Sequence, residues 1–151
     1  MHTIRTIGHK LSVKRKTNWV EVTIGVLGKK GQLKAFNPSL AISEGEVLTL
    51  EEKFQGGTGV NITPPSKEIV RDSVLKKSMG ACERLVNEIG LNGYGRVDAF
   101  LNTKTGDLLI LEVNTLPGLT PSTVLFHQAL AENPLISPRE FIEKIVDLGN
   151  K

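Results

Sequence analysis

Cysteine, aromatic residues and long apolar runs are all scarce in this chain of 151 residues. The single cysteine, Cys82, excludes a disulfide scaffold. No segment approaches the ~18 consecutive apolar residues of a membrane span, and no signal peptide is apparent. The hydrophobic content of 39% is ordinary, so the composition predicts one cytoplasmic domain with a packed core and no membrane partner.

Charge of one sign is also limited, since the net charge is only +3. Most of it arises in residues 1–18, from a cluster that consists of Arg5, Lys10, Lys14, Arg15 and Lys16. Such a cluster is compatible with contact to nucleic acid or to an acidic partner, but it is more often a solvated tail. A nucleic-acid partner is therefore not favoured.

The chain offers no Ser, Cys or His in a setting typical of a catalytic nucleophile. Cys82 lies in a helical pattern and is expected to be a small buried apolar residue. His127 lies on a short predicted helix, where a partly exposed histidine is a simpler interpretation than contact with a substrate. Any chemistry is expected to depend on electrostatics and on bound ions.

The most informative segment of the chain is the run E-V-N-T-L-P-G-L-T-P-S-T at residues 112–123. It follows an apolar strand, and a strand alternates its faces, so Glu112 and Asn114 point the same way while Val113 points to the other. A carboxylate and a carboxamide then lie side by side. Oxygen donors of this kind suit a hard cation.

Residues 94–101 and 108–113 are predicted to form a hairpin around this segment, with Gly106 in a left-handed turn position. Counting back from that turn pairs Asp98 with Glu112 and Arg96 with Asn114. The opposite face would then hold only apolar residues: Val97, Ala99, Leu101, Leu109, Leu111 and Val113. This pattern favours the register over a slip by one residue, which would bury the charges.

Two carboxylates directly opposite each other destabilise a strand pair by roughly 0.2–1 kcal/mol unless a positive group lies between them. A divalent cation resolves the repulsion, and Mg²⁺ (or Mn²⁺) suits one or two carboxylates plus substrate phosphates. Arg96 would suit a phosphate or carboxylate oxygen beside the metal. The alternative is a solvated hairpin face with an Arg–Asp surface pair.

The combination of R-V-D at 96–98 and E-V-N-T-L-P-G-L-T-P-S-T at 112–123 closely resembles the C-terminal signature of the D-alanine–D-alanine ligases, which belong to the ATP-grasp superfamily. The resemblance implies Mg²⁺ ligands at Asp98, Glu112 and Asn114, with Glu112 bridging two ions. It implies that Arg96 stabilises the transferred phosphoryl group and the tetrahedral intermediate.

Two positions of the following loop acquire roles from the same resemblance. The backbone amide of Gly118 would hold the reacting carboxylate oxygen. Thr123 stands where the family usually has a serine that contacts the carboxylate of the second substrate, and Ser122 beside it is assigned to the substrate as well. The change from Ser to Thr keeps the hydroxyl group and adds a methyl group.

Earlier segments resemble the nucleotide-binding parts of the family. Glu21, on a predicted strand at 19–27, takes the place of the glutamate that contacts the ribose hydroxyls; a solvated glutamate is the alternative. Residues 49–59 resemble the mobile loop, in which Lys53 would contact an ATP phosphate. Phe54 replaces the usual tyrosine of the substrate site, so a phenol hydroxyl is missing there.

The resemblance implies an ATP-dependent ligation of two small amino acids, with D-alanine expected, for peptidoglycan precursor synthesis. ATP phosphorylates the carboxylate of the first amino acid to an acyl phosphate. The amine of the second attacks it, and the tetrahedral intermediate collapses to the dipeptide and phosphate. In phosphoryl transfer, positioning and charge stabilisation supply most of the catalysis.

The fold expected from these parts is α+β: the C-terminal ATP-grasp subdomain, at 19–151, with an antiparallel sheet and packed helices behind the basic segment 1–18. One helix is predicted from a cap at Ser66 to about Ile89, with Val70, Val74, Leu85, Val86 and Ile89 toward the core. Two more are predicted at 122–131 and at 137–148, the last with a capping box formed by Ser137 and Glu140.

The recognisable resemblance spans residues 19–146, about a third of a typical ligase of the family. A fragment, a truncated reading frame or one part of a split enzyme is therefore expected. Its expected partner is the missing N-terminal half of the ligase or, in a homo-oligomer, another copy of the chain. The alternatives are a non-catalytic Mg-ATP-binding remnant or regulatory module, and an adaptor that binds nucleic acid through the basic N-terminus.

Overall fold

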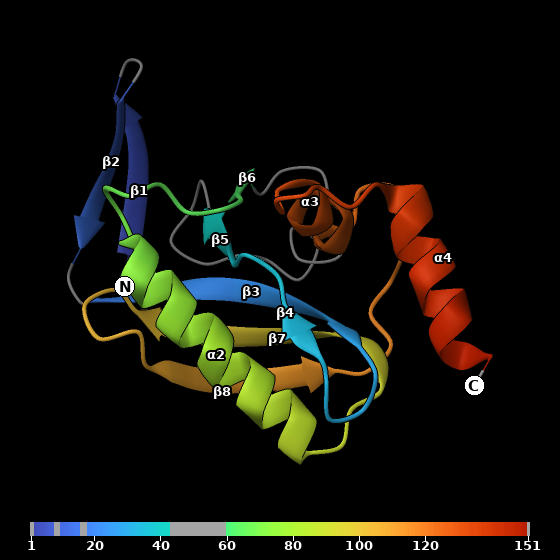
Figure 1. Cartoon of the computed structure of the whole chain (residues 1–151). Coiled ribbons are helices and arrows are strands. Elements are labelled where there is room, and N and C mark those ends of the chain that lie inside the picture. The colour runs from blue at the N-terminus through green and yellow to red at the C-terminus, as the bar shows by residue number, and fades with distance from the viewer. Residues whose placement is uncertain (1, 8–9, 16–17, 43–59, 151) are drawn as a thin grey trace.

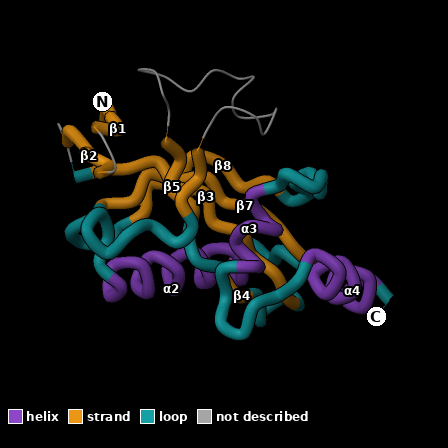
Figure 2. The backbone as a smooth tube through the Cα atoms, turned by 90° about the horizontal axis from the view of Figure 1, so that it is seen from above, coloured by secondary structure: helices purple, strands orange, loops and turns teal. Residues whose placement is uncertain are grey.

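The computed structural model of this protein describes residues 2–7, 10–15, 18–42 and 60–150. Its centre is a six-stranded sheet in the order β6-β5-β3-β7-β8, with β4 paired to β3 off this path. All its strand pairs are antiparallel. Helix α2 (Asp72–Glu88) covers one face of the sheet, whereas α4 (Pro138–Gly149) lies at the end remote from the N-terminal strands (Figures 1 and 2). The predicted α+β class is confirmed.

Strand β3 (Trp19–Gly28) shows the period of two that its sequence predicts. Its buried alternate residues face α2, and they are Val20, Val22, Ile24 and Val26. It then turns and pairs with the short β4 (Lys34–Ala35). Strand β5 (Ser39–Ile42) pairs with the same edge of β3, opposite β7, and β6 (Val60–Ile62) continues the sheet beyond β5. The apolar face of β3 thus forms the middle of the core.

Strands β7 (Gly93–Asn102) and β8 (Leu108–Asn114) form the predicted hairpin, with Gly106 at φ +77°. The register pairs Asp98 with Glu112 as predicted, but then shifts so that Ala99 faces Ile110.

The shift is a β-bulge at Leu111, and it corrects the predicted apolar face. Leu108 and Ile110 pack on the core, whereas Leu109 and Leu111 are 58% and 47% exposed. Because a bulge inserts one extra residue, every side chain of β8 before it changes face. Only Val97, Ala99, Leu101 and Val113 of the predicted set lie on the core side.

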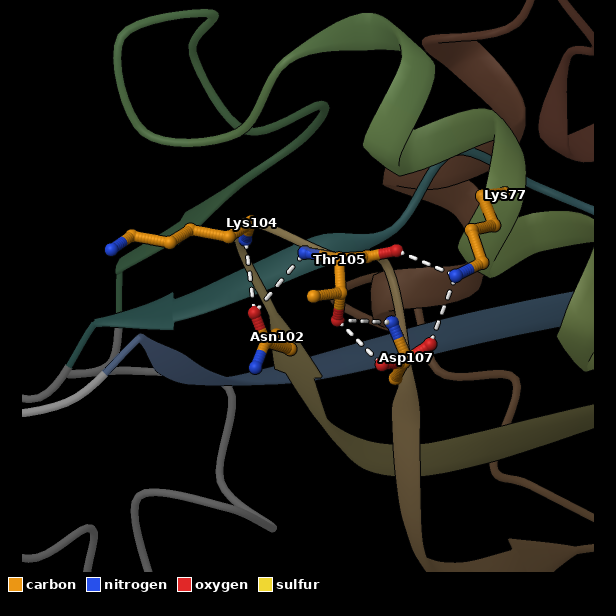
Figure 3. A network of polar contacts seen from close by, with 5 residues as sticks. All are labelled: Lys77, Asn102, Lys104, Thr105 and Asp107. Carbon is orange, nitrogen blue, oxygen red and sulfur yellow. Dashed lines mark hydrogen bonds and ion pairs between the residues drawn. The ribbon is translucent and has the colours of Figure 1, made fainter.

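The β7–β8 turn is fastened to α2 by polar contacts (Figure 3). Lys77 of α2 donates to the carbonyl of Thr105 at 2.8 Å and to Asp107 Oδ1 at 2.9 Å. Within the turn, Asn102 Oδ1 accepts from the backbone N–H groups of Lys104 and Thr105, and the Thr105 hydroxyl donates to Asp107. These contacts fix the turn end of the hairpin, at the opposite end from Glu112 and Asn114.

Helix α2 begins later than predicted, because its N-cap is Arg71 and not Ser66. The carbonyl of Ser66 instead accepts from the backbone N–H groups of Ile69 and Val70 in a separate turn. Val70, Val74 and Val86 are buried as predicted, but Ile89 is exposed because it follows the last helical turn. Gly90 ends the helix with φ +75°, as its sequence indicates.

Two strands lie where sequence analysis favoured a solvated tail. They are β1 (His2–Ile7) and β2 (Lys10–Arg15), which pair with each other in a separate antiparallel sheet. Threonine and isoleucine each occur twice in β1, and β2 contains Val13. These β-branched residues favour strands.

Helices α3 (Val124–Leu130) and α4 enclose a second apolar cluster centred on Phe141. Its ring contacts those of Phe36, Tyr94 and Phe126, with centroids 5.6–6.4 Å apart. The capping box of Ser137 and Glu140 that starts α4 is present as predicted. None of the helices that the structure describes is long and apolar enough to cross a membrane.

Candidate functional site

The face of the sheet opposite α2 brings four predicted site residues together. Arg96 and Asp98 lie on β7, and Glu112 and Asn114 lie directly across from them on β8, in the predicted pairing. Their faces are fixed because the intervening Val97 is fully buried on the α2 side. We call these four residues the oxygen cluster, after the oxygen donors of the last three.

Within the oxygen cluster every side chain contacts another. Arg96 donates from Nη2 and Nε to Asp98 Oδ2, at 2.8 and 3.2 Å, and its Nη2 lies 3.6 Å from Glu112 Oε1. The Asn114 amide donates to Glu112 Oε1 at 2.8 Å. The predicted grouping of these residues on one face is therefore present in the structure.

Thr23 on β3 is a fifth member of the site, and it was not predicted from the sequence. It lies opposite Asp98, and its hydroxyl donates to Asp98 Oδ1 at 2.9 Å, across 75 residues of sequence. The period of two placed Thr23 on the polar face of its strand, but the pairing of β3 with β7 is a long-range contact that no local pattern specifies. Asp98 thus has Arg96 on one oxygen and Thr23 on the other.

Asp98 is the most enclosed carboxylate of the cluster, with only 16% of its side chain exposed. Burial raises the pKa of Asp98 above its ordinary value, and a hydrogen bond shared with the Glu112 carboxyl acts in the same direction. Arg96 and the Thr23 hydroxyl oppose this change in pKa but do not cancel it. Two carboxyl groups this close favour the binding of a proton or a cation between them.

The donor chemistry of the cluster fits a hard divalent cation. Among the residues that the structure describes, no group of three or more His, Cys, Asp and Glu side chains could enclose a metal. Asp98, Glu112 and Asn114 instead offer two carboxylates and one carboxamide on a single face. Mg²⁺ is commonly held by one or two carboxylates and completes its octahedron with water and phosphate oxygens.

The loop after β8 leads from the cluster to α3. Gly118 is exposed, and no atom would lie within 4 Å of a Cβ built on it. Ser122 is exposed as well, 3.5 Å from the Thr120 hydroxyl, and Thr123 is the N-cap residue of α3 without a side-chain capping bond. These three predicted substrate-loop residues thus lie between the oxygen cluster and α3 in the chain.

Only some of the residues predicted to bind the nucleotide or the substrate lie within the part of the chain that the structure describes. Glu21 lies on β3, two residues before Thr23, and therefore on the same face of the sheet as the cluster. Lys53 and Phe54 lie outside the described residues, so their roles stay predictions.

A second residue that sequence analysis missed is Gln128, the neighbour of the exposed His127 on α3. Gln128 is fully buried, and its amide bonds to β3 and to β5. Its pattern signal is weak, because a glutamine in a seven-residue helix is ordinarily a surface residue.

Solved structures define the class of this fold. A D-alanine–D-alanine ligase from Coxiella burnetii aligns with 91% of this chain and 34% of its own, at a TM-score of 0.62 and 21% identity. The ligase from Bacillus anthracis complexed with ATP aligns with 93% of this chain and 40% of its own, also at a TM-score of 0.62, with 17% identity. The fold is thus that of the C-terminal part of an ATP-grasp ligase.

The family follows from the sequence. The family model described as "D-ala D-ala ligase C-terminus" matches residues 2–147, and the chain belongs to this family. Similar curated proteins include the D-alanine–D-alanine ligase of Carboxydothermus hydrogenoformans, 29% identical over 95% of this chain, and that of Oceanobacillus iheyensis, 33% identical over 93%. The chain spans 44% and 37% of the length of these two relatives.

Proposed function

We propose that this chain is the C-terminal catalytic part of an ATP-dependent D-alanine–D-alanine ligase, and that it acts with an N-terminal part or a second copy that completes the nucleotide cleft. The observation that carries the proposal is the oxygen cluster on the face of the sheet opposite α2, which we call the open face. There, one guanidinium, two carboxylates and a carboxamide converge. The reaction joins two small amino acids, D-alanine in the first instance.

Arg96 would stabilise the negative charge that develops as the γ-phosphoryl group passes from ATP to the carboxylate of the first amino acid. A guanidinium suits this role because it is always charged and can bind two oxygens at once. Its Nη2 bonds to Asp98 Oδ2 at 2.8 Å and lies 3.6 Å from Glu112 Oε1. The two carboxylates thus hold the guanidinium in a defined position.

Asp98, Glu112 and Asn114 would hold Mg²⁺ or Mn²⁺, and Glu112 would contribute to the binding of two ions. A metal ion held there would neutralise phosphate charge in the transition state. Thr23 would hold Asp98 in position through its hydroxyl, which leaves the carboxylate oriented toward the open face. Glu21, on the same face, remains the proposed contact to the ribose.

The loop between β8 and α3 would bind the amino acids. The backbone N–H of Gly118 would donate to the reacting carboxylate oxygen, and Ser122 and Thr123 would bind the carboxylate of the second amino acid. The amine of the latter attacks the acyl phosphate carbon. The C–O bond to phosphate then breaks, and phosphate and the amine proton leave.

The test is complementation with the N-terminal part of a related ligase, such as that of Oceanobacillus iheyensis, coexpressed with this chain. We expect phosphate release from Mg-ATP that depends on D-alanine. Glu112→Ala should reduce it by at least about 100-fold, since even an outer-shell partner of a metal ligand typically contributes 10–100-fold. The matched control is Asp107→Asn, which removes an exposed carboxylate at the other end of the same hairpin and should leave the rate unchanged.

Two results would contradict this assignment. Phosphate release that is independent of D-alanine would indicate another acceptor. Saturable Mg-ATP binding that never leads to turnover in the complemented complex would instead indicate a nucleotide-binding or regulatory module.

A further inference from the structure

The side-chain amide of Gln128 makes three hydrogen bonds, although glutamine is ordinarily a surface residue. Its Oε1 accepts from the backbone N–H of Gly25 at 2.8 Å, and its Nε2 donates to the carbonyl of Thr23 at 2.8 Å and to the Ser39 hydroxyl at 2.9 Å. One fully buried amide therefore joins α3 to β3 and β5. A buried amide that is left unpaired destabilises the fold, so these hydrogen bonds favour one docked position of α3 on the sheet.

Gly25 allows this close approach of α3 to the sheet. A Cβ atom built there would lie 2.5 Å from Gln128 Oε1, 2.6 Å from a Leu125 methyl and 2.9 Å from the Phe36 ring. Any side chain at this position would therefore force the Gln128, Leu125 and Phe36 side chains to move. Gly25 lies on the same face of β3 as Thr23, and side chains of α3 cover it there.

The contacts of Gln128 lie next to the oxygen cluster. Thr23, whose carbonyl accepts from Gln128, uses its own side chain to donate to Asp98. At its other end, α3 starts at Thr123, directly after the proposed substrate loop. A chain of hydrogen bonds and one short helix thus runs from Asp98 through Thr23 and Gln128 to Thr123.

We infer that Gln128 is a positioning residue that sets the place of the substrate loop relative to the oxygen cluster. This inference rests on the proposed function, in which the amino acids bind at the loop and the phosphoryl group is transferred at the cluster. The two sites lie on different segments, and acyl transfer requires reacting atoms to be held about 3–3.5 Å apart. Gln128 ties both segments to the same stretch of β3.

The chain offers a matched control in Asn87 of α2. Its amide makes the same kind of clamp, accepting from the backbone N–H of Leu33 at 2.9 Å and donating to the Leu33 carbonyl at 3.2 Å. It lies on the other side of the sheet and contacts no residue of the cluster. Gln128→Met and Asn87→Leu each replace an amide by an apolar side chain of similar size, so a general loss of stability would affect both variants.

The experiment uses the full chain labelled with ¹³C and ¹⁵N, and its primary readout is metal-free. We expect Gln128→Met to move the Asp98 carboxyl signal and the Thr123 amide signal, and Asn87→Leu to move neither. Ser39→Ala removes only one of the bonds of Gln128 and should give a smaller change of the same two signals, which provides a test if Gln128→Met does not fold. Unchanged Asp98 and Thr123 signals in both Gln128→Met and Ser39→Ala would overturn the inference.

A titration with Mn²⁺ then separates the inference from the proposed function. Bound Mn²⁺ should broaden the Asp98 and Glu112 signals of the native chain, and Gln128→Met should weaken binding by about threefold, less than the roughly 10–100-fold effect of direct outer-shell partners. If the native chain shows no such broadening, the metal assignment of the proposed function is wrong. The metal-free shifts still decide the role of Gln128. Equal Mn²⁺ affinity in Gln128→Met and the native chain would contradict a link to the cluster.

Discussion

The two faces of the central sheet are built from the same strands, yet they have opposite chemistry. On the α2 side, Val22, Val97 and Leu101 are fully buried among apolar neighbours. On the other side, Thr23 and Asp98 alternate with them and hydrogen-bond to each other. Because successive residues of a strand point to opposite faces, stability and chemistry are assigned to separate sets of residues. A substitution on one face can therefore leave the other intact.

The division is not complete, because the bulge in β8 places apolar residues on the open face. Leu109 and Leu111 lie there exposed, next to Glu112. Exposed apolar side chains beside a polar cluster are a feature of ligand or partner sites more than of free surfaces. They agree with the proposal that another part of the enzyme or a second copy covers this face.

The largest effect on stability is expected on the face of the sheet that α2 covers. Leu101→Ala removes a fully buried side chain from the core, and truncations of this kind cost about 2–5 kcal/mol in the free energy of unfolding. Chemical denaturation followed by circular dichroism measures this cost.

Leu109→Ala is the matched control, since Leu109 lies on the neighbouring strand with 58% of its surface exposed. It should change the free energy of unfolding by no more than about 0.5 kcal/mol. Equal costs for the two truncations would contradict the bulge, because without it Leu109 would face the core.

A second comparison uses two glycines that meet different surroundings. Gly25→Ala forces a methyl group against Gln128 and Leu125, and overpacking of this kind costs about 1–3 kcal/mol. Gly80→Ala lies inside α2, where the nearest atom to the new Cβ is the Arg84 guanidinium at 3.7 Å, so it should stabilise the helix by about 1 kcal/mol. Thermal unfolding of both variants checks the opposite signs, and a neutral Gly25→Ala would argue against the tight contact of α3.

Local sequence patterns were sufficient for most of the elements and for the grouping of the four residues of the oxygen cluster on one face. The alternation in residues 19–27 and the left-handed turn at Gly106 predicted β3 and the hairpin, and with them the pairing of Asp98 with Glu112. The capping box at Ser137 fixed the start of α4. In each case the physical cause lies within a few residues of sequence.

The misses have causes that act over longer distances. Four consecutive apolar residues, 108–111, carry no alternation, so the sequence could not show which of them face the core. The bond from Thr23 to Asp98 spans 75 residues, and that from Gln128 to Thr23 spans 105. Such contacts depend on which strands pair and where a helix docks, and propensity does not determine either of these.

The smallest effect is expected at the turn end of the hairpin, where Asp107 contacts Thr105 and Lys77 (Figure 3). Hydrogen bonds from Thr105, and then from Lys77, hold the pKa of Asp107 below its ordinary value. A carboxylate with a depressed pKa stabilises the folded state above the pKa that it has in the unfolded chain, and this contribution is lost as the pH falls through the pKa of the folded state.

Denaturation at pH 7 and pH 3 should therefore show a smaller acid loss, meaning a smaller decrease in the free energy of unfolding, for Asp107→Asn than for the native chain. Because the pair is exposed, the difference should be slight and should shrink in high salt. An identical acid loss in the two proteins would show that the Lys77 and Thr105 contacts do not stabilise the turn. The stability of the hairpin would then come from the face of the sheet that α2 covers.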